Sequence, residues 1–521
     1  MPRTTVPDRP TGTLTDAWRH SVGTGRLGLA LRRDYQDSLA LVQREIGFRH
    51  VRGHGLLSDD LGVHRPYDAA AGQGRRRGTR YVTTYLDQVV DAYLEAGIAP
   101  FVELGFMPAA LASGDRTVFW WQGNVTPPRD HREWADLVRA VVAHLVDRYG
   151  LDEVRGWPIE VWNEPDLGHF WAPGGDGAGD AQEAYFRLYE ASAHAVKDVD
   201  ASLQVGGPAL SPAGDDWWKP FADLVATRDV PVDFVSGHAY ASGPAQHVPF
   251  GTYQTVRPPE HLLERFAAPG RLLAGTGLAD VPVHVTEFNT SYRPDNPVHD
   301  TAYNAAYLAP VLAAGGDLVD SFAYWTFCDV FEEAGVPASF LHGGFGMLAH
   351  RQVKKPTFHL FAFMARLGAS VLARGRDHLV TRDDATGRVT VLAWQPVGGS
   401  DDPEEPERHE VRLSLPVAGV TAFALRSEVD TERGNAWAAW RAMGRPASPT
   451  GRQLDALREA AEPVRTAWAP PVVAGRVALD LTLGRHGVTL VEIDPVVDET
   501  PAWLDDRRVL GRAGREEAAD G

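Results

Sequence analysis

Cysteine is almost absent from this chain, because Cys328 is the only one among 521 residues. No disulfide can therefore form within the chain. The first residues, MPRTTVPDRPTGTLTDAW, contain no apolar stretch of the kind found in a secretory signal. No apolar run approaches the length of a membrane span. Together these absences lead us to expect a cytoplasmic protein that acts on small imported molecules rather than on insoluble polymer.

Basic residues are also fewer than acidic residues. Lys and Arg number 51 against 69 Asp and Glu, which gives a formal net charge of −18. Nucleic-acid-binding proteins normally carry a basic face, so nucleic acid is disfavoured as a partner, and the lack of an apolar span argues against a membrane partner. Metal-binding motifs are missing too, since there is no HExxH and the 19 histidines are scattered. We therefore expect neither a metal nor another cofactor.

One short motif is set aside. GTGRLG, residues 23–28, matches the dinucleotide pattern GxGxxG. That pattern has meaning only after a clear strand and within a βαβ unit that carries an acidic partner for the ribose. The preceding stretch, TLTDAWRHSV, is a poor strand of that kind, so we interpret the match as coincidental.

Tryptophan, by contrast, is frequent, with 15 residues. Most tryptophans are expected to fill the core, whereas a few could form flat platforms under sugar rings. The aromatic cluster 119–121 is equally compatible with core packing and with a platform under a leaving group.

Between about residues 20 and 330, short β-rich runs alternate with segments of helical periodicity. Apolar side chains recur at helical spacing in 134–146 and 185–199. This alternation predicts a parallel sheet with right-handed crossovers, and eight repeats favour a closed (β/α)8 TIM barrel over residues 18–340. An open doubly wound sheet is the alternative. The eight expected strands are HSVG at 20, FRHVRGHG at 48, IAPFVELGF at 98, PIEVWNE at 158, LQVGGPAL at 203, VDFVSGHAY at 232, PVHVTEFN at 282 and SFAYWTF at 321.

The pattern changes after about residue 340. Short alternating runs separated by turn residues are typical of an antiparallel β-sandwich, which we expect over residues 341–500 as an accessory domain. Residues 434–462 would be a helical insertion, and the acidic, proline-rich stretch 400–410 a solvated hairpin loop. The charged segment 501–521 is expected to be a frayed tail. For the N-terminal segment 1–17, the sandwich is a candidate packing partner.

Two glutamates stand at the ends of expected strands. Glu164 ends the run IEVWNE and is followed by Pro165, which cannot continue the ladder, and Glu287 ends VPVHVTE. Barrels place catalytic groups at the carboxyl ends of their strands, and these are the fourth and seventh strands. Glycoside hydrolysis needs one carboxyl group that protonates the leaving oxygen and a second, ionised one that attacks the anomeric carbon. A glutamate taken alone is usually an ion-pair partner. The sequences WNEP and TEFN around these two, each at the end of an expected strand, favour a catalytic role instead.

The chain also contains a set of longer motifs. They are WRHSVGTGRLGLAL (18–31), GFRHVRGHGLLSDD (47–60), PFVELGFMP (100–108), FWWQGNVTPP (119–128), EVWNEPDL (160–167), GHAY (237–240), VTEFNTSY (285–292), FAYWTFCDVFEE (322–333) and HGGFGM (342–347). In these motifs the chain resembles glycoside hydrolase family 39, and its β-xylosidase branch in particular. WNEP alone is shared more widely, whereas TEFNTSY, DVFEE and HGLLSDD together are specific to this family.

The resemblance implies a retaining, exo-acting β-xylosidase that releases xylose from the non-reducing end of short xylo-oligosaccharides. On this comparison Glu164 corresponds to the general acid/base and Glu287 to the nucleophile. Asn163 corresponds to the residue that hydrogen-bonds the sugar 2-hydroxyl. His54 and Asp59 correspond to residues of the loop that lines the pocket of the glycone, the sugar that is released.

The remaining substrate-binding residues are also implied by the resemblance. His238 and Tyr240 would orient the nucleophile and bind sugar, and Trp325 would form the aromatic floor. Glu332 would receive the far hydroxyls of the glycone, whereas its neighbour Glu333 is expected to be an ion-pair partner. Without the resemblance, a single histidine or tryptophan of this kind is more often part of the core.

One departure from the family pattern keeps alternatives open. Asp166 stands where the xylosidases commonly have asparagine, and the α-L-iduronidase branch shares this aspartate. That branch lacks TEFNTSY, however, and an anionic uronate would need a basic residue, for which Arg26 and Arg52 are the nearest candidates. The alternatives are α-L-iduronidase, another β-glycosidase, or a carbohydrate-binding protein without catalysis, which the two glutamates disfavour. The oligomeric state is open, and a homo-oligomer is compatible with the sequence.

Overall fold

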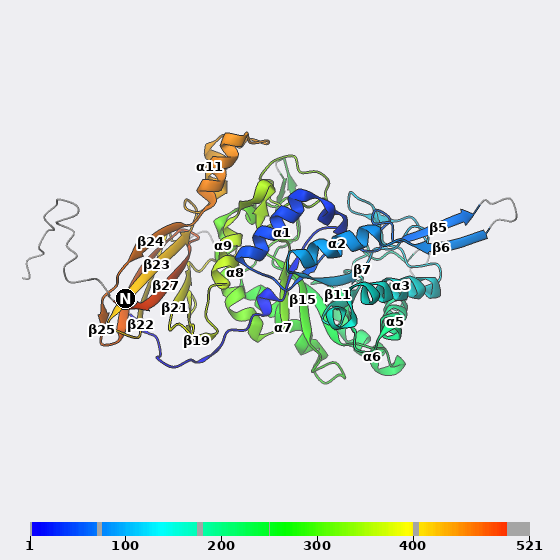
Figure 1. Cartoon of the computed structure of the whole chain (residues 1–521), viewed down its shortest axis with the longest axis horizontal. Helices are drawn as coiled ribbons and strands as arrows, with labels where there is room; N and C mark the ends of the chain where they lie inside the picture. Colours follow the sequence, from blue (N-terminus) through cyan, green and yellow to red (C-terminus); the bar gives the residue numbers. More distant parts are fainter. Residues whose placement is uncertain (1–2, 70–75, 174–180, 250, 400–405, 498–521) are drawn as a thin grey trace, which may run out of the picture.

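The computed structural model describes residues 3–69, 76–173, 181–249, 251–399 and 406–497. A β/α barrel and a smaller all-β body lie side by side along the long axis of the molecule (Figure 1). The first six residues of the expected loop 400–410 and the whole of the expected tail 501–521 lie outside the described residues.

The barrel is closed by eight parallel strands, each of which coincides with one of the eight runs expected from the sequence. In chain order they are β3 (Ser21–Gly23), β4 (His50–Arg52), β7 (Ala99–Leu104), β10 (Pro158–Val161), β11 (Gln204–Leu210), β12 (Phe234–Tyr240), β15 (Val283–Asn289) and β16 (Ser321–Tyr324). Each strand pairs with the next, and β16 pairs with β3 to close the ring. The predicted (β/α)8 barrel is therefore confirmed, and the open sheet is excluded.

A helix follows every barrel strand and covers the outside of the ring (Figure 1). These helices are α1 (Arg33–Glu45), α2 (Thr84–Glu95), α3 (His131–Tyr149) with the short α4 (Leu151–Val154), α5 (Ala181–Val199), α6 (Trp218–Arg228), α7 (Glu260–Leu273), α8 (Ala302–Ala314) and α9 (Pro356–Met364). In α3 the Asp130 side chain caps the first turn by accepting from Arg132 N at 2.8 Å. The helix ends at Gly150, whose φ of 88° an L-residue rarely adopts.

Short hairpins extend from the loops of the barrel. Between β4 and α2, strands β5 (His64–Ala69) and β6 (Arg76–Tyr81) project away from the ring at the end opposite the all-β body (Figure 1). The other pairs are β8 (Thr117–Val118) with β9 (Gly123–Asn124), β13 (Gln246–Val248) with β14 (Gly251–Tyr253), and β17 (Leu348–Ala349) with β18 (Val353–Lys354).

The all-β body is a sandwich of two mainly antiparallel sheets, as the alternating runs predict. One sheet has the order β2 (Gly12–Thr13), β19 (Ser370–Arg374), β20 (His378–Arg382), β21 (Val389–Trp394), β27 (Val488–Val496), β23 (Thr421–Val429), β24 (Val464–Trp468). The other has the order β1 (Thr4–Thr5), β22 (Arg408–Pro416), β26 (Arg476–Gly484), β25 (Val472–Val473). Every second residue of β22 and β26 is buried between the sheets, including Leu413, Leu415, Leu479 and Leu481.

Two segments connect the bodies. The N-terminal strands β1 and β2 pair with β22 and β19, one in each sheet of the sandwich. Between β23 and β24, helices α10 (Ala436–Ala442) and α11 (Gly451–Ala461) pack Trp440 and Leu457 against Phe340 and Leu341 of the loop after β16. The sandwich thus contributes to the support of a loop at the mouth of the barrel.

Candidate active site

Glu164 lies three residues beyond β10, in a strained turn. Trp162 and Glu164 have φ values of 73° and 43°, a conformation that costs a non-glycine residue roughly 1–3 kcal/mol. Hydrogen bonds hold the turn, because Glu164 N donates to Ala209 O at 3.0 Å and Leu167 N donates to Glu164 O at 3.0 Å. The carboxyl group is thereby fixed at the carboxyl end of the barrel, where strain is typical of functional positions.

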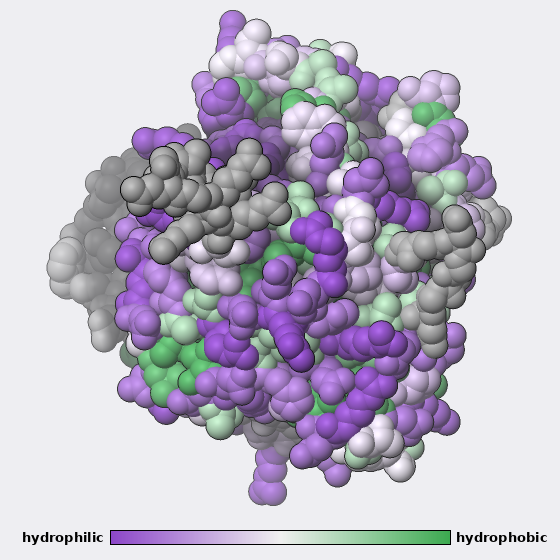
Figure 2. All heavy atoms as spheres, turned by 90° about the vertical axis from the view of Figure 1, so that its right-hand side faces the viewer, coloured by the Kyte–Doolittle hydropathy of each residue, from purple (hydrophilic) through white to green (hydrophobic). Residues whose placement is uncertain are grey.

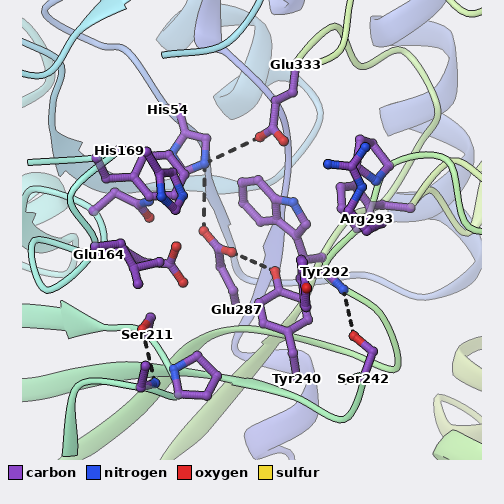
Figure 3. A pocket seen from close by; sticks show the side chains of 18 of the residues that line it. His54, Glu164, His169, Ser211, Tyr240, Ser242, Glu287, Tyr292, Arg293 and Glu333 are labelled. Carbon is purple, nitrogen blue, oxygen red and sulfur yellow. Dashed lines mark hydrogen bonds and ion pairs between the residues drawn. The ribbon is translucent and has the colours of Figure 1, made fainter. Parts of the chain in front are cut away.

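Glu287 belongs to β15, and both of its carboxylate oxygens have donors. Arg52 Nη1 donates to Oε1 at 2.7 Å, and Tyr240 OH donates to Oε2 at 2.7 Å. Figure 3 shows the Glu287 carboxylate at the centre of the cavity, with Tyr240 beside it and the Glu164 side chain pointing toward it. These donors favour the ionised carboxylate.

Arg52 is the centre of a buried charge network beneath the cavity. Its side chain has no solvent exposure and contacts Glu160 at 2.6 Å, Glu287 at 2.7 Å and Glu103 at 3.0 Å. It also donates to Asn163 Oδ1 at 3.0 Å. One guanidinium therefore fixes the positions of both Asn163 and Glu287.

His238 joins the two glutamates. Its Nδ1 donates to Glu164 Oε1 at 2.8 Å and lies 3.6 Å from Glu287 Oε2. Because one atom lies this close to both oxygens, Glu164 Oε1 and Glu287 Oε2 are at most 6.4 Å apart. The two carboxyl groups thus face the same small volume.

The surroundings move the pKa values of the two glutamates in opposite directions. Burial and then the charge of Glu287 raise the pKa of Glu164, and the bond from His238 offsets only part of this rise. Burial alone would also raise the pKa of Glu287, but the charges of His238, Arg52 and His54 outweigh it, so this pKa is lowered. Over the intervening pH range Glu164 is protonated while Glu287 is ionised, which is the division of labour that acid-assisted nucleophilic attack needs.

A cavity of about 770 Å³ opens above the two glutamates, a size typical of small-ligand sites. Glu164 follows β10 and Glu287 lies in β15, so these two strands divide the ring of the barrel into two arcs. One arc contains β11 and β12, and the other contains β7, β4, β3 and β16. The β16-side half is lined by His54, Phe119, Trp325, Glu333, Ala334 and Phe345. The β12-side half includes Ser211, Ser242, Arg257, His261 and Arg265, which follow β11 and β12, whereas Arg293 follows β15 at the boundary of the two halves. In Figure 3, His54 and Glu333 lie above Glu287, and Ser211 and Ser242 lie below it.

Most of the residues expected at the site lie together on this wall. They are His54, Asn163, Glu164, Tyr240, Glu287 and Trp325. His238 stands behind the wall, buried against Glu164, so its expected direct contact with sugar has no support in its position. His54 Nδ1 bonds Glu103 Oε2 at 2.7 Å, which turns Nε2 toward Glu287 and Glu333 at 3.7 Å each.

The expected role of Glu332 is wrong. Its side chain is turned away from the cavity, because Arg26 Nη2 and Arg32 Nη1 bind its two oxygens at 2.9 and 2.8 Å. Its neighbour Glu333, expected to be an ion-pair partner, lines the cavity instead. Burial, together with the charges of Glu287 and Glu164, raises the pKa of Glu333 to about 8. A neutral Glu333 can both donate and accept a hydrogen bond.

The expected position of Asp59 is also wrong. Asp59 is exposed, and its Oδ2 accepts from Ala109 N at 3.1 Å, so it ties together two loops instead of lining the pocket. Asp166, the departure from the xylosidase pattern, accepts hydrogen bonds from Ser211 N at 2.9 Å and from Ser211 Oγ. It is therefore a loop contact that positions Ser211 in the cavity wall.

Aromatic packing explains two further sequence features. In the cluster 119–121, Phe119 lines the cavity, Trp121 packs on it at a centroid distance of 5.4 Å, and Trp120 is 57% exposed. The GxGxxG match is a packing motif, since a Cβ at Gly23 would lie 2.3 Å from the Trp325 ring. Gly23 therefore allows Trp325 to form part of the cavity wall.

Sequence reasoning missed the buried partners of the site. The sequence offers Arg52 only as a candidate without a position, and its motifs assign no role to Glu103 or Glu160. All three point into the barrel from β4, β7 and β10. A charged residue within a barrel strand is a signal that could have identified them, because buried charges need partners.

In the described parts of the chain no three His, Cys, Asp or Glu side chains are grouped as metal ligands would be. Nor is any described helix both long and apolar enough to cross a membrane.

Comparisons with known proteins agree with this geometry. The family model described as glycosyl hydrolases family 39 matches residues 4–478. A β-xylosidase of Geobacillus stearothermophilus is 46% identical, with 94% of this chain and 96% of the relative covered. The crystal structure of a family 39 enzyme from Xanthomonas axonopodis pv. citri superposes with a TM-score of 0.84 at 30% identity, covering 95% and 98% of the two chains. Human α-L-iduronidase is more distant, at 23% identity over 89% of this chain and 73% of that protein. The chain therefore belongs to glycosyl hydrolase family 39.

Proposed function

We propose that this glycoside hydrolase is a retaining, exo-acting β-xylosidase that releases xylose from short xylo-oligosaccharides. The observation that carries the proposal is the Glu164–Glu287 pair, with oxygens at most 6.4 Å apart and pKa values moved in opposite directions. Retaining glycosidases hold their carboxyl groups about 5–5.5 Å apart, whereas inverting ones need about 6.5–9.5 Å to admit a water. The geometry of this pair thus favours retention.

In the proposed reaction Glu287 attacks the anomeric carbon while Glu164 protonates the leaving oxygen. This forms a glycosyl ester on Glu287, and Glu164 then takes a proton from the water that cleaves the ester. Asn163, fixed by Arg52, would hydrogen-bond the sugar 2-hydroxyl. Tyr240 and Arg52 hold the attacking carboxylate in place.

The β16-side half of the cavity is the proposed glycone pocket. Trp325 and Phe119 offer apolar faces, and Glu333, with a pKa of about 8, offers a hydrogen-bonding group for sugar hydroxyls. Arg293, which follows β15 at the boundary between the two halves, already contacts Asp295 at 3.2 Å. Arg26 is bound to Asp60 and Glu332, and Arg52 to three carboxylates. This half is therefore poorly suited to the carboxylate of an iduronide.

The similarity to a named relative and the complete carboxyl pair also support this proposal. The 46% identical relative named a β-xylosidase supports the choice of sugar, and a complete carboxyl pair argues against a binding protein without catalysis. We propose residues 18–340 as the catalytic domain and 341–500 as the accessory sandwich. A cytoplasmic location and a place in the breakdown of xylan fragments follow from the same proposal.

Hydrolysis of matched nitrophenyl glycosides, followed by ¹H NMR of the first product anomer, tests the proposal. We expect kcat/KM on the β-xyloside to exceed that on the β-glucoside by roughly 10–200-fold, since the glucoside must place an extra CH₂OH group. The first product should be β-xylose. A preference for the glucoside or an α-L-iduronide would contradict the proposed sugar, and α-xylose as first product would contradict retention.

A further inference from the structure

The β12-side half of the cavity carries basic groups for which the cleavage of a neutral sugar has no use. Arg257, His261 and Arg265 line it and Arg293 lies at its boundary, in a chain whose net charge is −18. The β16-side half, by contrast, has a carboxyl group, Glu333, and aromatic rings. The basic side chains of the cavity are therefore concentrated in its β12-side half.

Two of these arginines already have carboxylate partners. Arg265 makes a paired contact with Asp215 at 2.6 and 2.8 Å, and Arg293 contacts Asp295 at 3.2 Å. Arg257 differs, because its Nη1 donates to His261 Nε2 at 3.0 Å. Within the described parts of the chain Arg257 has no carboxylate at ion-pair distance, so its positive charge is not neutralised.

The lowered pKa of the neighbouring His261 indicates that its surroundings are positively charged. Burial and then the charges of Arg257 and Arg265 lower the pKa of His261, and Glu264, with Oε2 4.0 Å from Nδ1, opposes them only weakly. A neutral ring that accepts from Arg257 is consistent with this. An anion bound beside Arg257 would therefore meet a net positive potential.

The barrel order places this half on the side of the leaving group. Ser211 follows β11 and Arg257 follows β12. Both therefore lie on the arc between β10 and β15 that is opposite the proposed glycone pocket. The group that Glu164 protonates departs toward this arc. Arg257 and the ring of His261 are thus positioned to contact a leaving group.

We propose that the β12-side half, through Arg257, binds a carboxylate carried by the leaving group, as in a xylo-oligosaccharide with a uronic acid substituent. This inference rests on the proposed xylosidase activity and defines its substrate class. Arg257 is a specificity residue here, and it takes no part in bond cleavage. Because its side chain is exposed, the expected preference is modest and sensitive to salt.

The test compares one acidic xylo-oligosaccharide with its methyl ester, which removes only the charge. For the wild-type enzyme at low ionic strength we expect kcat/KM on the acid to exceed that on the ester by roughly 2–5-fold, and this preference to disappear at about 1 M salt. Arg257→Gln should abolish the preference, so that the ratio of kcat/KM on the acid to that on the ester falls to about one, whereas Arg257→Lys should keep part of it. Arg33→Gln, which changes a 91% exposed arginine on α1, is the matched control and should keep all of it.

The outcomes separate this inference from the proposed function. Equal rates on acid and ester in the wild type, or a preference that persists in Arg257→Gln, would overturn the carboxylate site while xylosidase activity stands. Failure to cleave any neutral β-xyloside would overturn the proposed function itself. Since the ester rate reports an intact fold in each variant, a folding defect cannot be mistaken for lost specificity.

Discussion

At the scale of single residues, the proposed mechanism uses one side-chain type for two tasks. Glu164 and Glu287 are chemically identical, yet His238 bonds one of them, and Arg52 with Tyr240 binds the other. Burial dominates at Glu164 and opposite charge dominates at Glu287, which separates their pKa values. The proposed roles therefore come from the neighbours of each glutamate.

Removing the acid should harm poor leaving groups most. We expect Glu164→Ala to slow the first step by about 10²–10⁴-fold for leaving groups that need a proton, and very little for highly acidic phenols. Stopped-flow and steady-state rates over a series of aryl β-xylosides measure this. Equal losses across the series would mean that Glu164 has only a structural role.

Replacing His238 should shift the pH profile. His238 lowers the pKa values of both glutamates, and Asn places an amide near the position of Nδ1 without a charge. Activity requires Glu287 ionised and Glu164 protonated. The acidic limb of the pH profile therefore follows the pKa of Glu287, and the basic limb follows the pKa of Glu164. In His238→Asn both limbs of kcat/KM against pH should move to higher pH. Unmoved limbs would show that His238 does not set these pKa values.

Sequence reasoning had its limits at this same scale. The positions of Glu164 and Glu287 could be predicted because each lies near the carboxyl end of a barrel strand within a specific motif. Glu332 and Glu333 were exchanged, because in an irregular loop no periodicity tells which of two neighbouring residues faces inward. The answer depends on Arg26 and Arg32, which are distant in sequence and bind Glu332.

At the scale of elements, a buried ion network holds the loop 342–347 at the mouth of the barrel. Lys355 Nζ contacts Asp300 and Asp329 at 2.7 Å each. The same aspartates accept from Gly343 N and Gly346 N of the loop, both at 2.7 Å. This loop carries Phe345 into the cavity wall, so the network links stability to the shape of the pocket.

Breaking this network should be costly. Lys355→Met leaves two carboxylates buried without their cation, and such a loss destabilises by about 3–5 kcal/mol. We expect a lower Tm and a higher KM for xylosides. The adjacent Lys354→Met is the control, because its partners Glu45 and Glu462 are 30% and 52% exposed and such a pair contributes about 0–1 kcal/mol. Similar Tm losses in both variants would contradict this account.

Whole strands and helices were easier to predict than their contacts. The eight barrel strands could be found because each is a short β-rich run followed by a helical period. The buried Arg52 network could not, since its charges lie on three strands that only barrel closure brings together. Local pattern determines an element, whereas its partners depend on tertiary packing.

At the scale of the whole molecule, barrel and sandwich are physically joined. Val488 and Leu490 of β27 belong to the same buried apolar cluster as Leu308 and Leu312 of α8. The N-terminal strands add to the sandwich, where Val6 is fully buried and its N donates to Ser414 O at 3.0 Å. We therefore expect the two bodies to unfold together.

Deleting residues 1–13 tests this connection. Loss of the buried Val6 alone removes about 1.5–3 kcal/mol of apolar burial, and the pairing of β1 and β2 is lost as well. Calorimetry should show a lower Tm for the shortened chain. Its kcat/KM well below that temperature should not change, because no described residue of this segment lines the cavity. An unchanged Tm, or a loss of activity at low temperature, would contradict the account.

The proposed identity of Glu287 as the nucleophile is the central claim, and covalent trapping tests it most directly. A 2-deoxy-2-fluoro-β-xyloside with a good leaving group should inactivate the enzyme by forming a stable ester, because fluorine slows both the formation and the hydrolysis of the ester, whereas the good leaving group speeds only its formation. Peptide mass spectrometry should then find one fluoroxylosyl group per chain, on Glu287. A label on any other residue, or continued turnover with no covalent adduct under saturating inhibitor, would contradict the mechanism.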